Sequence, residues 1–360
     1  MKTKKMISLL LVLALIAGVL AGCSSDTTDT SNNQDLETTT TENTENNGSV
    51  EFPTKDLQGT IMWAAGGIND SVSRALGPYI QEELGKTVIF TNRPGAAGGI
   101  ATQYVNEQSA DGYNILFGAE NPQIAKVMGT SNLDYSDFIP INIFSTTVGV
   151  VSVRSDSKYK TMEDLVNDML ARPGEVTMAV TGPGGYPQVA DSMLKSIVGT
   201  EAQYVTFDGE AGALTAVLGE HVDFTITTLG SSYEMLRSGD LVGLAVYHTE
   251  PVEGIEDVPV IIDSYPKFND YLPWGPFYGA FVKNGTPQEI VDILTEAFEK
   301  AVSNPDYSEM TKNLGNVPLG IGGQEARDFI DNYRSITSWL LYDAGATESS
   351  PEEFGIQRVN

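Results

Sequence analysis

Apolar residues follow two alternating patterns along the chain from about residue 57 onward. Short apolar runs of strand length alternate with longer segments in which apolar positions recur every three or four residues. The first series predicts strands at 60–63, 87–90 and 114–117 and helices at 72–84 and 99–108. The second series predicts strands at 148–153, 176–180, 203–206, 223–226 and 243–246 and helices at 162–170, 188–198 and 211–218. This β-α-β rhythm predicts an α/β protein with parallel strands, arranged as two units in tandem.

The C-terminal part follows a different pattern. Residues 257–285 are rich in proline and aromatic residues, and helical patterns return at 287–303, 305–314 and 324–341. Pro287 and Pro305 stand at predicted helix starts, where the missing N–H of proline has no cost. The folded part, from about residue 57 to residue 360, is long enough for two lobes of ordinary size.

The N-terminus carries the features of an export signal. Three lysines precede an apolar run at 6–20 that ends in Leu-Ala-Gly-Cys, with the cysteine at Cys23. The run is shorter than the roughly 20 apolar residues that span a bilayer, so 1–22 is predicted to be a cleaved signal peptide. The last four residues resemble the bacterial lipobox. That resemblance implies a lipid on Cys23 and attachment to the outer face of the cell membrane. Cys23 is also the single cysteine of the chain, which excludes an intramolecular disulfide.

The segment after Cys23 has a composition that favours disorder. Residues 24–51 are mostly Ser, Thr, Asn, Gln, Asp and Glu, with almost no apolar residue. Such a segment buries too little surface to fold, and its acidic residues repel one another. We therefore expect a disordered acidic tether over 23–56.

The charge of the chain limits its partners. The formal net charge is −27, and removal of the signal peptide with its three lysines would make it more negative. Nucleic acid and anionic lipid are therefore unfavourable partners. No motif in the sequence calls for a cofactor. An anionic ligand stays compatible with this charge where the binding site itself is locally positive.

Two glycine-rich turns mark the predicted site. One is Trp-Ala-Ala-Gly-Gly-Ile-Asn-Asp at 63–70, and the other is Thr-Gly-Pro-Gly-Gly-Tyr-Pro at 181–187. Each follows a predicted strand and precedes a predicted helix, where open sheets bind ligands. Glycines allow close backbone approach, and the helix start offers free N–H groups to a carboxylate. A Gly-Gly pair before a helix is often only a tight turn, but the matching positions of the two turns predict a ligand clamped between two lobes.

Several motifs, in order, resemble one family: the extracytoplasmic solute receptors of tripartite tricarboxylate transporters, also called Bug receptors. The resemblance covers about 57–341. Its carriers are the first glycine turn at 63–70, NRPGAAGG at 92–99, ADGY at 110–113, FDGEAGAL at 207–214, LGEHVD at 218–223, Asp-Val-Pro at 257–259 and Gly-Thr-Pro at 285–287.

The resemblance implies a two-lobed Venus-flytrap receptor whose chain crosses twice between lobes, in place of the tandem order. Lobe I would comprise 57–147 plus 271–360, and lobe II 148–270. The ligand would be a small organic acid, a carboxylate or related amide, passed to an integral membrane permease. The ligand-binding residues implied by position are Trp63, Ala65, Gly66, Gly67, Asn69 and Asp70 in the first turn, Thr181, Gly182, Gly184, Gly185 and Tyr186 in the second, and Phe207, Asp208, Gly209 and Thr227 in lobe II.

This sequence departs from the family pattern near the site. Gly185 stands where many relatives have serine or threonine, Gln188 where histidine is common, and Asp208 where lysine is common. The absence of a cation at Asp208 favours a neutral or monocarboxylic ligand over citrate, although dipoles can still bind a dicarboxylate. Ile68, at a position that is often small, narrows the pocket.

Three other functions were weighed against this one. An enzyme is disfavoured because His221 and His248 are the only histidines and neither lies near a catalytic motif or a paired acid and base. An aromatic cluster at 274–281 suits a sugar-binding groove, but its place near the predicted crossing favours packing at a hinge. A metal site is disfavoured by the scarcity of histidine and cysteine, with carboxylate-only calcium binding left open. We therefore predict a receptor without catalytic function, and a receptor for a different solute class, such as a sugar or an amino acid, stays open as the alternative.

Overall fold

The computed structural model describes residues 50–272 and 274–359. The predicted signal peptide, Cys23 and the tether up to residue 49 lie outside the described residues. The described end of the predicted tether contacts the folded part. The ring of Phe52 packs edge-on against Tyr113, with 4.9 Å between ring centroids. The Thr54 amide donates to the Tyr113 hydroxyl at 2.9 Å. Within the described residues, none of the helices is both long and apolar enough to cross a membrane.

The first sheet has six strands in the order β11-β4-β10-β3-β1-β2. Its strands are β1 (Leu57–Ile61), β2 (Val88–Asn92), β3 (Asn114–Ala119), β4 (Phe138–Thr146), β10 (Phe277–Lys283) and β11 (Val317–Gly322). β1 runs parallel to β2 and β3, whereas β10 runs antiparallel to β3 and β4, and β11 antiparallel to β4. The sheet is therefore mixed.

The second sheet has five strands in the order β7-β6-β8-β5-β9. They are β5 (Gly149–Arg154), β6 (Thr177–Val180), β7 (Gln203–Thr206), β8 (Phe224–Thr228) and β9 (Leu241–Val246). β6 is parallel to β7 and β8, and β5 is antiparallel to β8 and β9. The predicted parallel pairing is confirmed for β1 to β3 and for β6 to β8, and each sheet also contains antiparallel strands that the β-α-β pattern did not predict.

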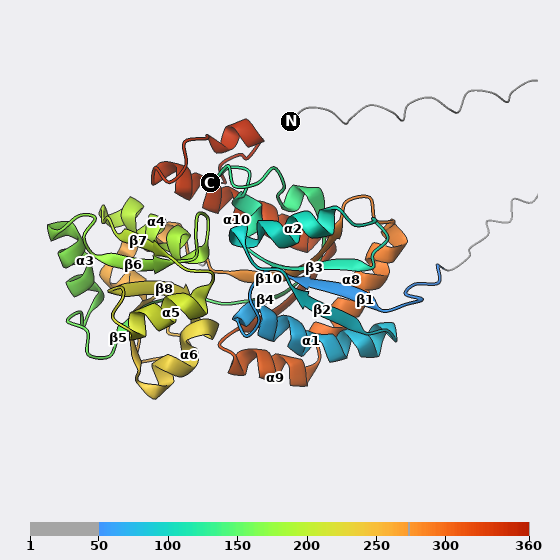
Figure 1. Ribbon diagram of the computed structural model, residues 1–360, viewed down its shortest axis with the longest axis horizontal. Helices are drawn as coiled ribbons and strands as arrows, with labels where there is room; N and C mark the ends of the chain where they lie inside the picture. The colour runs from blue at the N-terminus through green and yellow to red at the C-terminus, as the bar shows by residue number, and fades with distance from the viewer. Residues whose placement is uncertain (1–49, 273, 360) are drawn as a thin grey trace, which may run out of the picture. The chain divides into compact units, whose positions relative to one another are not determined.

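Helices cover both faces of each sheet. Those around the first sheet are α1 (Ile68–Leu84), α2 (Gly99–Asn106), α8 (Gln288–Val302), α9 (Pro305–Asn313) and α10 (Gly323–Asp343). Those around the second are α3 (Met162–Ala171), α4 (Tyr186–Val198), α5 (Glu210–Leu218) and α6 (Leu229–Ser238), and a short α7 (Ile261–Ser264) follows β9. Figure 1 shows α2 above and α1 and α9 below the first sheet, and α4 above and α5 and α6 below the second.

The chain crosses between the sheets twice, after β4 and again between β9 and β10. The tandem order that the apolar pattern suggests is therefore wrong, and the crossed order implied by the family resemblance is confirmed. The reason is β10. It lies inside the proline- and aromatic-rich stretch, yet its residues 277–282 are buried, and it pairs between β3 and β4 at the centre of the first sheet.

Local sequence explains where the helices begin and end. α3 begins at a capping box in which Thr161 and Asp164 each accept a hydrogen bond from the other's backbone N–H. Pro305 opens α9 behind the Asn304 cap, whose side chain accepts from the Asp306 amide. α1 ends at Gly85, whose φ of 65° is the left-handed conformation that favours glycine.

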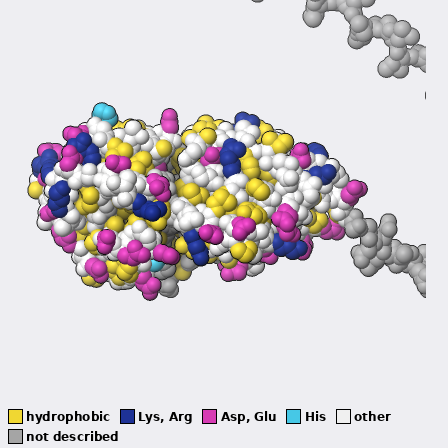
Figure 2. All heavy atoms as spheres, turned by 90° about the horizontal axis from the view of Figure 1, so that it is seen from below, with side chains coloured by type: hydrophobic (Ala, Val, Ile, Leu, Met, Phe, Trp, Pro, Cys, Tyr) yellow, Lys and Arg dark blue, Asp and Glu magenta, His cyan; other side chains and the backbone are white. Residues whose placement is uncertain are grey.

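Acidic side chains are spread across the surface. Figure 2 shows Asp and Glu scattered over the whole visible face of the folded part, with Lys and Arg among them and no single acidic patch. The large negative charge is therefore a general property of this surface, and the ligand site must be judged from its own lining residues.

Candidate functional site

A cavity of about 350 Å³ lies where both sheets contribute their strand ends. Its lining comes from the segments that follow β1, β3, β6, β7 and β8, which are the carboxyl ends of the strands. Ligands of open α/β sheets bind at this edge. The lining residues are Trp63, Ala64, Ala65, Gly66, Gly67, Ile68, Asn69, Ser71, Ala119, Glu120, Thr181, Tyr186, Gly209, Glu210, Ala211, Leu214, Thr228, Gly230, Ser231, Met235, Tyr278 and Leu314.

Four helices, α1, α4, α5 and α6, begin at this cavity. Three of them have glycine at the N-cap, namely Gly67, Gly185 and Gly209, so no side chain is present to accept their first amide hydrogens. α6 follows Thr228, whose side chain likewise makes no capping hydrogen bond. Each helix start carries about half a positive charge. At the start of α6 the Thr228 amide already donates to the Glu210 carboxylate. The cavity is thus electropositive at its backbone, which suits a carboxylate.

Eight of the predicted site residues line the cavity: Trp63, Ala65, Gly66, Gly67, Asn69, Thr181, Tyr186 and Gly209. Gly185 lies one residue outside it, and a Cβ there would meet the Thr181 hydroxyl oxygen at 2.2 Å. A side chain at position 185 would therefore collide with Thr181 in this chain. Gly182 and Gly184 have φ values of 100° and 73°, so they shape the turn without lining the cavity.

Asp70 stabilises the first turn instead of facing the cavity. Its carboxylate accepts hydrogen bonds from the Gly66 amide at 2.9 Å, from Arg74 Nε at 2.7 Å and from Asn92 Nδ2 at 2.9 Å. Burial acts to raise the pKa of Asp70, but these three partners outweigh it and the pKa is lowered. The ionised carboxylate therefore holds the glycine turn in place.

The remaining predicted residues lie away from the lining. Thr227 is fully buried inside β8. Phe207 packs against the small apolar cluster beneath α5, and Asp208 is exposed. Asp208 is therefore not among the residues that line the cavity.

Two glutamates that the sequence reasoning missed line the cavity. Glu120 follows the end of β3 in the first sheet, and Glu210 is the first residue of α5 beside the second. A signal for each was present: Glu120 lies shortly after the predicted strand at 114–117, and Glu210 directly precedes the predicted helix at 211–218. Neither glutamate was among the predicted site residues, which came from the two glycine-rich turns and from positions implied by the family resemblance.

The two carboxyl groups have different partners. Glu210 accepts from the Thr228 amide at 2.9 Å and from the Thr228 hydroxyl at 2.6 Å. Glu120 is buried, with 6% of its surface exposed. Burial raises the pKa of Glu120 to about 8, and the nearby charge of Glu210 adds to this, against opposing contributions from its own amide and the Asn121 side chain. Burial also raises the pKa of Glu210, although Ser231 and Thr228 act to lower it.

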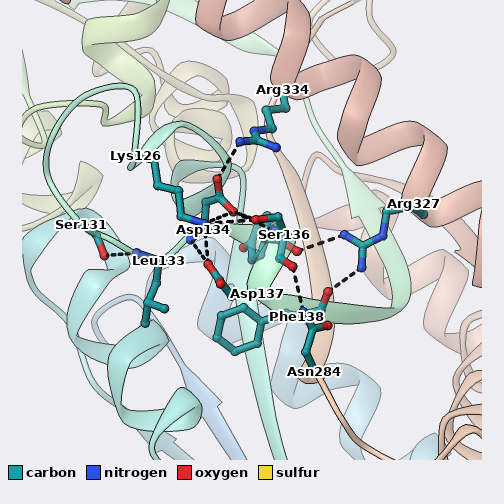
Figure 3. Close-up of polar contacts among 11 residues, drawn as sticks. Lys126, Ser131, Leu133, Asp134, Ser136, Asp137, Phe138, Asn284, Arg327 and Arg334 are labelled. Atoms are coloured by element: carbon teal, nitrogen blue, oxygen red, sulfur yellow. Dashed lines mark hydrogen bonds and ion pairs between the residues drawn. The ribbon is translucent and has the colours of Figure 1, made fainter. Parts of the chain in front are cut away.

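A polar cluster fixes the segment behind Glu120. Figure 3 shows Lys126 and Arg334 both reaching Asp134, at 3.1 and 2.9 Å. This cluster holds the short helix η3 (Tyr135–Asp137), and the Tyr135 hydroxyl donates to the carbonyl oxygen of Ala119, the residue before Glu120. The Tyr135 ring also stacks on Phe281 of β10 at 4.0 Å. Glu120 is therefore presented from a rigid support.

The aromatic cluster near the second crossing is mostly core. Trp274, Phe277 and Phe281 are buried, and Trp274 stacks on Tyr186 at 5.5 Å while its Nε1 donates to the Thr337 hydroxyl at 3.0 Å. Only Tyr278 of this cluster lines the cavity. Within residues 50–272 and 274–359, no group of three or more His, Cys, Asp or Glu side chains is placed to hold a metal ion.

A comparison with family models identifies the protein's relatives. The model of the tripartite tricarboxylate transporter family receptor matches residues 72–340. The chain belongs to this family. The resemblance seen in the motifs is thereby confirmed, and so is the prediction of a receptor instead of an enzyme.

Individual relatives agree with this assignment. Protein BugT of Bordetella pertussis (strain Tohama I) is 24% identical over 300 residues, which cover 82% of this chain and 91% of BugT. Rpa4515 of R. palustris, solved with adipate, superposes with a TM-score of 0.75 at 23% identity, covering 82% of this chain and 99% of that one. MatC from Rhodopseudomonas palustris, solved with bound malate, superposes with a TM-score of 0.71 at 22% identity. The match covers 79% of this chain and 100% of MatC. These structures share the two-lobed fold.

Proposed function

We propose that this receptor captures a small organic acid, a carboxylate or related amide, and delivers it to the membrane permease of a tripartite tricarboxylate transporter. The observation that carries the proposal is the convergence of four helix N-termini, three of them capped by glycine, on one cavity of about 350 Å³. Adipate and malate, the ligands of Rpa4515 and MatC, belong to the same chemical class.

Backbone N–H groups bind the acid in this proposal. None of the described residues that line the cavity is Lys, Arg or His, so no cationic side chain there is available to pair with a carboxylate. Backbone N–H groups at helix starts bind anions without such a side chain. This favours a ligand with one carboxylate, or with two that are both held by dipoles, over a tricarboxylate.

The proposed mechanism is closure of two lobes around the ligand. Lobe I comprises 57–147 plus 271–360, and lobe II comprises 148–270. Because both sheets line the cavity, a ligand there contacts both lobes, and closure follows where the ligand binds the closed form better than the open one. The closed form is then the species that the permease recognises.

The N-terminus keeps the receptor near that permease. We propose that the signal peptide is removed, that Cys23 carries the lipid, and that the acidic tether spaces the folded part from the outer face of the cell membrane. Two or more acyl chains on one cysteine give the stable attachment that a single chain does not. Replacement of Cys23 by serine should release the protein into the medium, and retention of that variant in the membrane fraction would contradict the lipid anchor.

A thermal-shift screen tests the ligand class. Carboxylates, their amides and sugars are added separately to the purified full-length protein, because a ligand that binds only the folded state raises the melting temperature. We expect at least one carboxylate or amide to raise it in a saturable manner. Stabilisation by a sugar with none by any carboxylate or amide would favour the aromatic lining as a sugar site and refute the proposal.

A further inference from the structure

Gly230 is the second residue of α6, a position where the helix itself gains nothing from glycine. Inside a helix glycine loses more backbone freedom than alanine does, which makes it the less favourable residue. The φ of Gly230 lies outside the left-handed region, so the local backbone conformation does not require glycine either. The reason for a glycine at this position therefore lies outside α6.

That reason is the close approach of the opposite lobe. A Cβ built at position 230 would lie 2.7 Å from the carbonyl oxygen of Leu314, 2.7 Å from Asn316 Nδ2 and 2.8 Å from Ile68 Cδ1. Favourable contacts between heavy atoms are about 3.5–4.0 Å long, so a methyl group does not fit there. All three neighbours belong to the proposed lobe I, whereas Gly230 belongs to lobe II. The two lobes thus meet at this glycine.

The lobe I side of this contact is a turn held by its own hydrogen bonds. Residues 314–316 join α9 to β11, and α9 lies on the same lower side of the molecule as α6 in Figure 1. Gly315 has a φ of 69°, and its carbonyl oxygen accepts from the Thr147 hydroxyl at 2.9 Å. Asn316 is 2% exposed, and its Nδ2 donates to the Leu314 carbonyl at 2.8 Å. The turn therefore has little freedom to retreat from a methyl group.

The lobe II side is fixed as well. The Leu229 amide donates to the Val148 carbonyl at 2.8 Å. Just before it, the Thr228 amide and hydroxyl donate to the Glu210 carboxylate at 2.9 and 2.6 Å. The start of α6 is thus tied to its own lobe at two successive residues. A side chain at position 230 is accommodated by separation of the lobes and not by movement of α6 alone.

The contact lies beside the first crossing between the two sheets. Thr147 and Val148 connect β4 to β5, and they form hydrogen bonds with the 314–316 turn and with α6 respectively. Gly230 and Leu314 also line the cavity, so the contact lies on the cavity side of the crossing. A group inserted there acts as a wedge. Because it is close to the hinge, a small separation at the wedge produces a larger one at the far end of the cleft.

We propose that Gly230 is a positioning residue for ligand capture: the missing side chain at the start of α6 lets the 314–316 turn of lobe I dock on it and so permits closure. This inference rests on the proposed function, since it assumes capture by closure, but it is independent of the ligand's chemical class. A side chain at position 230 changes the equilibrium between open and closed forms. It therefore lowers the affinity for every ligand by a common factor.

Titration calorimetry on the purified full-length protein tests this common factor. The probes are malate, adipate and each further carboxylate, amide or sugar that raises the melting temperature of the unmodified protein. We expect Gly230→Ala to weaken every bound probe tenfold or more, by factors that agree within threefold. An unchanged affinity, or a loss for one probe beside normal binding of the others, would overturn the inference.

Small-angle X-ray scattering separates closure from direct contact between the new methyl group and the ligand. With a saturating probe, the unmodified protein should become more compact. Gly230→Ala, saturated with the same probe, should keep the larger radius of gyration of its ligand-free form. Equal compaction of both proteins would show that the methyl group acts on the ligand instead of on closure, and would contradict the proposal.

Gly212→Ala is the matched control. Gly212 is the third residue of α5, and a Cβ there would meet the nearest atom, Phe207 Cβ, at an ordinary 3.4 Å within lobe II. This variant should change the affinity for each probe less than twofold. The ligand-free melting temperature of Gly230→Ala should equal or exceed that of the control, because the open form accommodates the methyl group. A melting temperature several degrees lower would show a clash that lobe movement does not relieve, which refutes the wedge.

Failure of the proposed function gives a different result. The unmodified protein would then bind a sugar and no carboxylate or amide, and the same comparison of Gly230→Ala with Gly212→Ala would be made with that sugar. Binding of a carboxylate by the unmodified protein without any compaction would instead overturn the role of Gly230 and leave the ligand class standing.

Discussion

The side-chain Nδ2 of Asn121 donates a hydrogen bond to the carbonyl oxygen of Gly184 at 2.9 Å. Asn121 begins the short helix η2 (Asn121–Ile124) just after β3 of the first sheet, and Gly184 lies in the glycine turn after β6 of the second. The bond therefore joins the two halves of the folded part directly beside the cavity, and Asn121 is the neighbour of Glu120. In the proposed mechanism, a bond between the two halves stabilises the closed form.

Loss of this contact should weaken ligand binding. Asn121→Ala removes the donor, and a net contribution of about 1 kcal/mol for such a bond corresponds to a roughly fivefold loss of affinity. We expect calorimetry to show this loss with a change in melting temperature of the ligand-free protein that is small by comparison. An unchanged affinity would mean that the bond does not favour closure.

Filling the cavity should abolish binding without unfolding the protein. Gly209 lines the cavity with a φ of 172°, which any residue adopts, and a Cβ built there meets nothing within 4 Å. Gly209→Leu therefore adds a side chain to open space without backbone strain. We expect the thermal shift by ligand to disappear while the melting temperature of the free protein stays within a few degrees.

A leucine on the exposed side of the same helix is the control for this variant. Thr215 is exposed on α5, and Thr215→Leu should bind the ligand normally. Full binding by Gly209→Leu would show that the ligand occupies another place.

The ligand-free protein should lose stability as the pH rises. The pKa of Glu120 is about 8 in the folded chain against 4.5 as its ordinary value, because burial disfavours the ionised form. Between these pH values the folded state holds a proton that the unfolded state has released, so the free energy of unfolding falls with increasing pH. Urea unfolding at pH 5 and pH 8 should show this fall, and Glu120→Gln should reduce it. An identical pH profile in the variant would contradict the buried, protonated state of Glu120.

Removal of Asp70 should destabilise the first turn. Asp70→Ala deletes the acceptor of three hydrogen bonds, from Gly66, Arg74 and Asn92, and hydrogen bonds to a charged group are typically worth about 1.5–3 kcal/mol each. We expect a lower melting temperature together with weaker ligand binding, because the same turn lines the cavity. Glu82→Ala changes an exposed acid on the same helix and should alter neither property.

The sequence was sufficient for the elements whose pattern is local. β1, β2 and β3 with α1 and α2, and β6, β7 and β8 with α4 and α5, all appear near their predicted positions because apolar periodicity and glycine turns are read along the chain. β4 and β10 were missed. Pro140 interrupts the first, and proline and aromatic residues surround the second, so neither shows a plain strand pattern. Their burial follows from pairing: β10 lies between β3 and β4, and β4 lies between β10 and β11.

The site was predictable in its backbone and less so in its side chains. Gly66 and Gly67 could be found because glycine before a helix has a recognisable pattern, whereas Gly209 was predicted only from the family resemblance. Glu120 and Glu210 could not be paired from sequence, since they are 90 positions apart and meet only because the chain crosses between the sheets. Asp208 was the acid chosen from the sequence because it lies in the motif at 207–214. Its side chain is exposed, whereas Glu210, further along the same motif, lines the cavity.

A crystal structure of the complex with the tightest-binding carboxylate tests the central claim most directly. The account predicts the ligand in the cavity between the two sheets, with its carboxylate oxygens within about 3 Å of backbone N–H groups at the starts of α1, α4, α5 or α6. A ligand carboxylate paired with a lysine or arginine side chain, or a ligand bound outside this cavity, would contradict it.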